Sequence, residues 1–125
     1  VSSEFFIKEQ LKSSEMRLKA MMDSTNDGNV LVDTNYKVLN FNKVAQESIF
    51  SFFGEAITYG DDYRNYVLAD DYTEFQQYFQ KALQGEITRM ERQIKFGDFT
   101  SWIEVTYYPV YDADNSLFGV AFNYV

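Results

Sequence analysis

Few residues in this sequence could do chemistry, and their types narrow what the protein can be. The 125 residues include no histidine and no cysteine. The commonest general base, thiolate nucleophiles and the usual haem and transition-metal ligands are therefore missing. Acidic doublets stand at Asp61-Asp62 and Asp70-Asp71, but no base or nucleophile accompanies them. No glycine-rich phosphate loop occurs either, so we predict no catalytic residue and no metal site.

Two other charged groups leave alternatives open. Arg89 and Arg92 lie on one predicted strand and could meet an anionic ligand, although a solvated face is the simpler interpretation. Asp112, Asp114 and Asn115 loosely suggest a cation-binding loop. Because the glycine and the closing glutamate of a calcium loop are absent, this segment is better interpreted as a turn.

The charge and composition restrict the partners and the compartment. A formal net charge of −8 disfavours direct contact with nucleic acid or with an anionic membrane surface. No segment approaches the roughly 20 apolar residues of a membrane span. The absence of cysteine favours the cytosol, so we expect a cytoplasmic domain that inserts into no membrane. The first residue, Val1, and the apolar run at 120–125 suggest boundaries within a longer protein.

The elements that could position a binding site begin with a helix. Residues 1–24 form an N-terminal amphipathic or linker segment, helical from about residue 3, and residues 25–125 form the domain proper. Apolar residues within the helix follow the 4-3-4-3 spacing of a heptad seam, interrupted by one serine: Ile7, Leu11, Ser14, Leu18 and Met21. The seam favours a homodimer through this helix, and packing against the same domain is the alternative.

The rest of the chain reads as two strands, a group of helices and three strands. Asn42 and Gly54 are placed to begin and end the first of these helices. Asp70 or Asp71 begins the last one, where Asp71 and Glu74 resemble a capping box. The predicted strands are 30–32, 36–41, 87–96, 101–111 and 117–125. Short turns between neighbouring strands predict an α+β fold in which helices cover one face of a five-stranded antiparallel sheet.

This order, together with two local patterns, resembles the PAS domain family over residues 14–125. The opening pattern is held by Gly28, Val30, Val32, Asp33, Phe41, Asn42 and Ala45. The closing pattern is held by Trp102, Pro109, Val110, Asp112, Phe118 and Gly119. A small α+β cone fold of the ketosteroid-isomerase kind is an enzyme alternative. It places its helices before the sheet, whereas here two strands come first.

The resemblance also implies which cofactors are missing. Flavin-binding relatives use a cysteine in a segment that corresponds to residues 63–68 here, and an amide where Ile103 stands. Haem-binding relatives use a histidine. Because the sequence has neither cysteine nor histidine, we expect no covalent flavin and no haem, and an unidentified small molecule remains the candidate ligand.

In the family, the ligand cavity lies on the side of the sheet that faces the helices. Strand alternation places three residues of each of the last two strands on that side. The pocket candidates are therefore Ile103, Val105, Tyr107, Val120, Phe122 and Tyr124. An apolar wall with two tyrosine hydroxyls suits a small aromatic or lipid-like ligand. Simple core packing is the alternative for the same side chains.

The resemblance implies a regulatory, non-catalytic domain of a bacterial signal-transduction protein. A sensor histidine kinase is the expected host, and a diguanylate cyclase is the next. We expect the domain to relay a signal through its flanking helices. A ligand-free dimerisation module of the same fold is the alternative.

Overall fold

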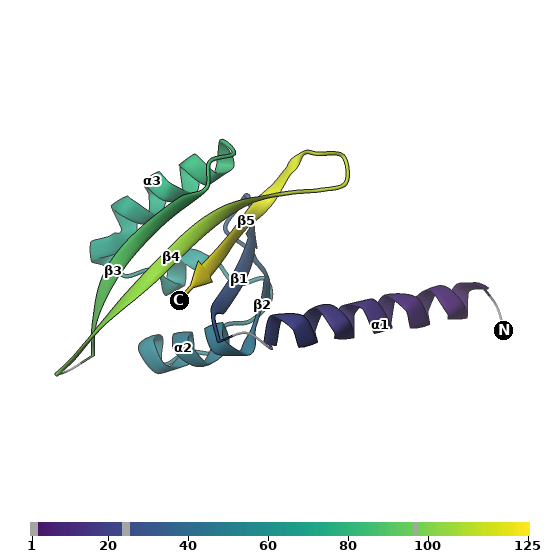
Figure 1. The fold of residues 1–125 in the computed structure, drawn as a ribbon, viewed down its shortest axis with the longest axis horizontal. Helices are drawn as coiled ribbons and strands as arrows, with labels where there is room; N and C mark the ends of the chain where they lie inside the picture. Colours follow the sequence, from purple (N-terminus) through teal and green to yellow (C-terminus); the bar gives the residue numbers. More distant parts are fainter. Residues whose placement is uncertain (1–2, 24–25, 97) are drawn as a thin grey trace.

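The computed structural model describes residues 3–23, 26–96 and 98–125 of the chain. It contains three α-helices, two short 3-10 helices and five strands. In chain order these are α1 (Ser3–Asp23), β1 (Gly28–Asp33), β2 (Val38–Phe41), α2 (Lys43–Phe53), η1 (Tyr63–Tyr66), η2 (Ala69–Asp71), α3 (Tyr72–Leu83), β3 (Thr88–Phe96), β4 (Phe99–Tyr111) and β5 (Leu117–Tyr124). The predicted order of strands and helices is confirmed (Figure 1).

The five strands form one sheet in the order β2-β1-β5-β4-β3, and every neighbouring pair is antiparallel. Phe122 on β5 lies between Val30 on β1 and Tyr107 on β4, so these three side chains share one sheet face. All three are buried. The helices α2 and α3 contact β1 and the β3–β5 strands respectively. The predicted α+β fold, with helices covering one face of an antiparallel sheet, is therefore confirmed.

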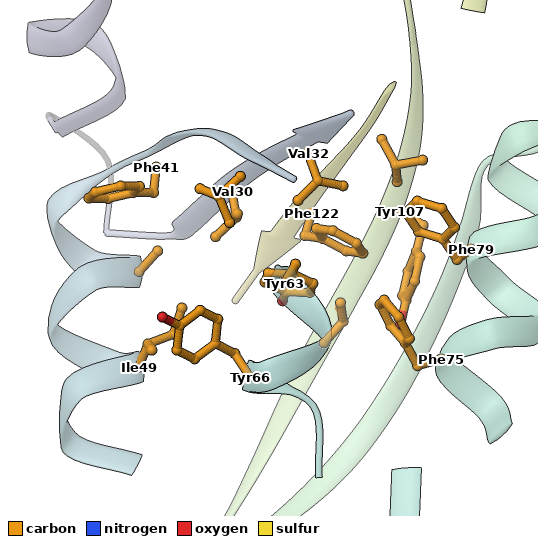
Figure 2. Close-up of a cluster of buried hydrophobic side chains, with 14 of the residues drawn as sticks. Val30, Val32, Phe41, Ile49, Tyr63, Tyr66, Phe75, Phe79, Tyr107 and Phe122 are labelled. Carbon is orange, nitrogen blue, oxygen red and sulfur yellow. The ribbon is translucent and has the colours of Figure 1, made fainter. Parts of the chain in front are cut away.

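The core between sheet and helices is rich in aromatic rings (Figure 2). The ring of Tyr63 stacks on Phe122 with 4.6 Å between centroids, and Tyr107 meets Phe122 edge-on at 4.9 Å. From α3, Phe75 and Phe79 pack against the same ring. Such offset and edge-on contacts are the favoured arrangements of aromatic pairs, and they join η1, α3 and the sheet into one core.

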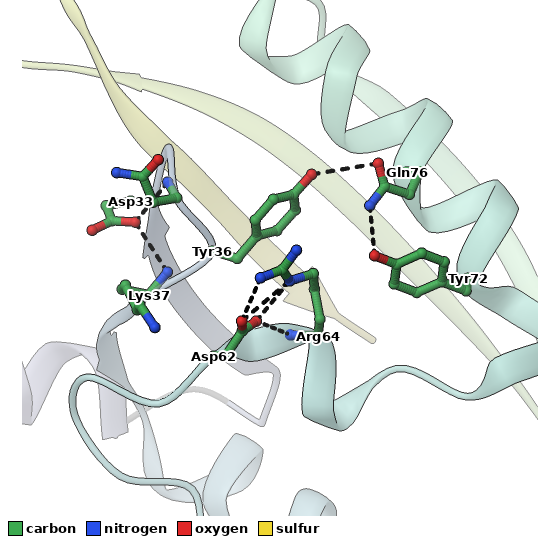
Figure 3. Close-up of polar contacts among 8 residues, drawn as sticks. Asp33, Tyr36, Lys37, Asp62, Arg64, Tyr72 and Gln76 are labelled. Carbon is green, nitrogen blue, oxygen red and sulfur yellow. Dashed lines mark hydrogen bonds and ion pairs between the residues drawn. The ribbon is translucent and has the colours of Figure 1, made fainter.

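The second strand is shorter than predicted, because Tyr36 does not belong to it. Tyr36 adopts a left-handed backbone conformation with φ of 67°. The carboxylate of Asp33 accepts hydrogen bonds from the backbone N–H groups of Asn35 and Lys37, which fixes a turn at this place. The ring of Tyr36 then stacks on Phe79 at 4.3 Å. Figure 3 shows its hydroxyl reaching toward Gln76 of α3, to which it donates a hydrogen bond.

Both ends of α2 are as predicted, whereas the start of α3 differs. Asn42 caps α2 by accepting the N–H of Ala45 at 3.0 Å, and Gly54 ends the helix with φ of 73°. At the start of α3, Asp71 makes no side-chain capping bond. The predicted capping box between Asp71 and Glu74 is therefore wrong, and both carboxylates instead face Arg92 of β3.

The strand that carries Pro109 has only one neighbour at that position. Pairing of β4 with β3 ends at Tyr107, and the pairing of β4 with β5 becomes irregular between Val110 and Tyr111. A proline removes one ladder donor, which is tolerated at such a strand end or irregularity. The turn that follows is confirmed as a turn. The carboxylate of Asp112 accepts the N–H groups of Asp114 and Ser116.

The N-terminal helix α1 extends away from the sheet and the other helices (Figure 1). Its described side chains are almost all exposed, including Ile7 at 56%, Leu11 at 59% and Met21 at 68%. The side chain of Leu18 lies outside the described residues. Packing of this seam against the domain's own core is therefore not the arrangement in this structure. Among the described residues, no helix has the length and apolar character needed to cross a membrane.

Candidate functional site

A cleft of about 790 Å³ lies between α2 and the helix-facing side of the sheet. One wall consists of α2, with Val44, Ser48, Ile49 and Phe52 among its lining residues. The periodic apolar face of α2 supplies this wall, because its residues recur every three to four positions. The opposite wall comes from β3, β4 and the end of β5. The cleft thus lies where two layers of the fold separate, which is a usual place for a small-molecule site.

Five of the six pocket residues predicted from strand alternation line this cleft: Ile103, Val105, Tyr107, Phe122 and Tyr124. Ile103 and Tyr124 are partly buried, and the other three are buried. The sixth residue, Val120, is fully buried in the core and does not line the cleft. Val120 lies two residues before Phe122 on β5, opposite Val32 and Pro109, beyond the end of the cleft.

Two tyrosine hydroxyls meet inside the site. Tyr63 of η1 and Tyr124 of β5 are hydrogen-bonded to each other through their hydroxyl groups, and both residues line the cleft. Burial raises the pKa of Tyr124, so its hydroxyl stays protonated at neutral pH. This pair therefore offers both a donor and an acceptor to a ligand.

Tyr66 adds a third hydroxyl beside α2. Its hydroxyl donates a hydrogen bond of 2.6 Å to the carboxylate of Asp61, which also accepts bonds from Thr58. Burial, helped by the hydrogen bond to Asp61 and by the negative charge of that carboxylate, raises the pKa of Tyr66 to about 12. The same hydrogen bond lowers the pKa of Asp61. The Tyr66 ring is thereby held in a fixed position at the edge of the cleft.

The one sheltered cation at the cleft is Arg92, among the residues that the structure describes. Its side chain is 19% exposed, and Nη1 lies 2.7 Å from a carboxylate oxygen of Asp71. Nη2 lies 3.5 Å from Glu74 and 3.7 Å from the sulfur of Met90. Alternation along β3 places Arg92 on the helix-facing side with Met90, whereas Arg89 is exposed on the other face. The expectation that both arginines lie on a solvent-exposed face is therefore confirmed for Arg89 and wrong for Arg92.

Burial raises the pKa of Tyr107, and the positive charge of Arg92 acts in the opposite direction. The hydroxyl of Tyr107 therefore remains neutral near the ion pair. Among the described residues, no group of three or more acidic side chains could hold a metal ion.

Sequence reasoning missed the α2 and η1 walls of the site and its charged pair. The apolar face of α2 was visible in the sequence, but nothing local shows which strands it covers. Alternation along β3 was also visible, since Met90 and Arg92 occupy alternate positions. Nothing local indicated that Tyr63 would come close to the end of β5, because its contact with Tyr124 joins distant parts of the chain.

The end of α1 is tied directly to the start of α2. The carboxylate of Asp23, the last residue of α1, accepts the N–H of Lys43 at 2.9 Å. That N–H is one of the amides left without a partner at a helix start, where a carboxylate is favourable. The helix that lines the cleft is therefore in contact with the helix that leaves the domain.

Comparison with known proteins finds one matching family model and several solved structures of similar fold. A family model described as "PAS domain" matches residues 18–125. Similar solved structures include a PAS domain from Colwellia psychrerythraea, 20% identical, with a TM-score of 0.65 over 89% of this chain and 93% of that chain. A sensory box sensor histidine kinase from Vibrio cholerae is 12% identical, with a TM-score of 0.57 over 94% of each chain.

The phage VqmA–DPO complex is a further structural relative. It is 14% identical to this chain, with a TM-score of 0.68 over 95% of this chain and 55% of that chain. At such identities these structures support the shared fold alone. No curated protein matches the chain.

Proposed function

The chain belongs to the PAS domain family, and on that premise we propose that it is the signal-receiving domain of a bacterial sensor histidine kinase. PAS domains are generally non-catalytic sensory modules, and the family match covers most of the chain. Structural neighbours that belong to histidine kinases favour this host over a diguanylate cyclase, our second candidate. The domain itself carries out no reaction in this proposal.

The cleft receives the signal, and its lining carries the proposal. Aromatic and aliphatic walls with a few hydrogen-bonding hydroxyls are typical of a small-molecule site. Among the structural relatives, the phage VqmA structure is a complex with DPO. Here the hydroxyls of Tyr63 and Tyr124 would orient such a ligand within a mostly apolar space.

The signal leaves through α2 and α1. A ligand that fills the cleft presses on Ile49 and its neighbours on α2. Because Asp23 accepts the N–H of Lys43, movement at the start of α2 reaches the end of α1. The change requires two arrangements of similar free energy, of which the ligand favours one.

A homodimer through α1 would turn that movement into output. Ile7 and Leu11 are exposed on the side of α1 that carries the predicted seam. Burying a heptad seam against the same seam of a second chain removes this apolar surface from water. A ligand that shifts the end of α1 would then change the packing of two helices at once.

Native mass spectrometry of the purified domain tests the sensor proposal. A stoichiometric added mass on the folded protein supports it. Ile103→Trp should abolish that added mass, because the larger ring occupies the cleft. Ile87→Trp is the matched control, since Ile87 is 60% exposed and lies outside the cleft lining. A bare wild-type mass, with no small molecule bound in screens, would instead support the ligand-free dimerisation module.

A further inference from the structure

Two opposite charges lie together on the wall of a mostly apolar cleft. Five charged residues line the cleft: Glu47, Asp70, Asp71, Arg92 and Lys95. Glu47, Asp70 and Lys95 are exposed, so solvent screens their charges. The side chains of Arg92 and Asp71 are only 19% and 22% exposed, and they lie 2.7 Å apart. A ligand in this part of the cleft therefore meets these two charges with less solvent screening than at the three exposed residues.

The ion pair joins the start of α3 to β3, and it completes no helix cap. Asp71 leaves the start of α3 without a side-chain cap in order to face Arg92. A guanidinium carries five N–H donors, and the contacts to Asp71, Glu74 and Met90 engage only its two terminal nitrogens. Arg92 can therefore accept a further anionic partner without losing all of those it has.

The charges of this wall select among ligand classes. A ligand with only a carboxylate would gain Arg92 but would be repelled by Asp71 and by Glu74 behind it. A ligand with only an ammonium group would gain Asp71 but would be repelled by Arg92. A ligand with both groups on one carbon satisfies both charges, because each of its ions then faces an opposite one.

Neighbouring apolar and aromatic side chains form a surface on which the apolar part of a ligand could pack. Met90, Phe75 and Tyr107 line the cleft together with Arg92 and Asp71. Tyr107 lies opposite Thr88 and is buried, so its ring forms part of a dry surface beside the charges. A flat or branched apolar side chain would be removed from water there.

On the basis of the proposed sensory function, we propose that the cleft binds a free α-amino acid with an aromatic or aliphatic side chain. Its carboxylate pairs with Arg92, its ammonium group with Asp71, and its side chain enters the aromatic part of the cleft. In the ligand-free state the two protein charges neutralise each other, so neither is left buried without a partner.

Three probes that share one ring test this inference by calorimetry on the purified domain. They are L-phenylalanine, 3-phenylpropionate, which lacks the ammonium group, and 2-phenylethylamine, which lacks the carboxylate. We expect L-phenylalanine to bind at least about tenfold more tightly than either, since each probe loses one charge-assisted contact. Equal binding of the three, or tighter binding of a singly charged probe, would overturn the inference.

Two variants should each remove the advantage of L-phenylalanine over one of the two singly charged probes. Arg92→Met should remove the advantage of L-phenylalanine over 2-phenylethylamine. Asp71→Asn should remove its advantage over 3-phenylpropionate. Arg89→Met is the matched control, because Arg89 is exposed on the opposite face of the same strand. A variant that does not fold leaves the wild-type comparison of the three probes to decide.

The outcomes separate this inference from the sensory function on which it rests. A co-purified ligand with a single charge or none, together with no binding of L-phenylalanine, would overturn the amino-acid inference and leave the sensor proposal standing. A domain that carries no ligand and binds none of the three probes would overturn the amino-acid inference, and only negative small-molecule screens in addition would contradict the sensor proposal.

Discussion

Asn29 and Asn42 exchange two hydrogen bonds between the start of β1 and the start of α2. The N–H of Asn29 donates to the side-chain oxygen of Asn42 at 2.8 Å, and the N–H of Asn42 donates to the carbonyl of Asn29 at 3.0 Å. The side-chain oxygen of Asn42 also caps Ala45, and its amide nitrogen donates to the carbonyl of Asp27 at 2.6 Å. One buried side chain thus joins a strand to the helix that walls the cleft.

Replacement of this side chain should be costly. Asn42→Ala leaves the N–H groups of Asn29 and Ala45 and the carbonyl of Asp27 without these partners at a site only 1% exposed. We expect the free energy of unfolding to fall by about 3 kcal/mol, measured by urea denaturation. Asn35→Ala is the control, because Asn35 is exposed, and it should change stability by less than about 0.5 kcal/mol. Similar effects of both variants would contradict this account.

Gly119 is required by the pairing of β5 with β1. A Cβ at this position would lie 2.0 Å from the carbonyl oxygen of Val32. Gly119→Ala should therefore force the two strands apart and lower stability by more than about 3 kcal/mol, or prevent folding. Gly54→Ala offers a contrast, since its Cβ would meet nothing within 4 Å and only its φ of 73° is unfavourable. The free energy of unfolding of that variant should fall by about 1 kcal/mol. Thermal or urea unfolding of both variants measures the difference.

The α1 seam predicts which substitutions abolish a dimer. Leu11→Glu places a charge in the seam and should weaken self-association at least about tenfold, as measured by sedimentation equilibrium. Met16→Glu is the matched control, because Met16 is 66% exposed on the same helix but lies off the seam spacing. Equal loss of association in both variants would show that the dimer does not use this seam. A wild-type monomer at all concentrations would rule the dimer out.

The Tyr66–Asp61 hydrogen bond should make stability depend on acid pH. The bond lowers the pKa of Asp61 in the folded state, so the unfolded chain binds a proton more readily there. The contribution is present above the ordinary aspartate pKa of 3.8, and it is lost as the pH falls through the lower, folded-state value.

Urea unfolding at a series of pH values tests this dependence. Asp61→Asn should flatten the loss of stability as the pH falls below about 4, and Tyr66→Phe should reduce it in part. Asp114→Asn in the exposed 112–116 turn should keep the wild-type pH dependence. If the free energy of unfolding of Asp61→Asn falls with decreasing pH as steeply as that of the wild type, other carboxylates cause the acid sensitivity.

Much of the fold follows from local pattern. The caps of α2 at Asn42 and Gly54, the apolar face of that helix and the alternation along β4 are all set by near neighbours in the chain. Short turns then leave an antiparallel order as the simplest way to bury one face of each strand. The same alternation found five of the six predicted lining residues, because the sheet places alternate side chains on one side.

Predictions from local sequence pattern were wrong where a side chain contacts a residue distant in the chain instead of a near neighbour. Asp71 and Glu74 have the spacing of a capping box, yet both carboxylates face Arg92, whose charge outweighs a backbone amide. Tyr36 has the composition of a strand residue, yet its ring packs on Phe79 and its backbone turns. At both places the local structure is decided by a tertiary contact, and that contact forms only when the sheet and the helices pack together.

By itself the sequence determined the order of elements, the sheet with its helix-covered face and the absence of cysteine and histidine chemistry. Tertiary structure alone decided that α2 and the sheet stand apart as a cleft, that Tyr63 meets Tyr124, and that Arg92 and Asp71 share a sheltered wall. The reason is physical. Periodicity and capping act over a few residues, whereas a cavity and its charges depend on which distant side chains the packed core brings together.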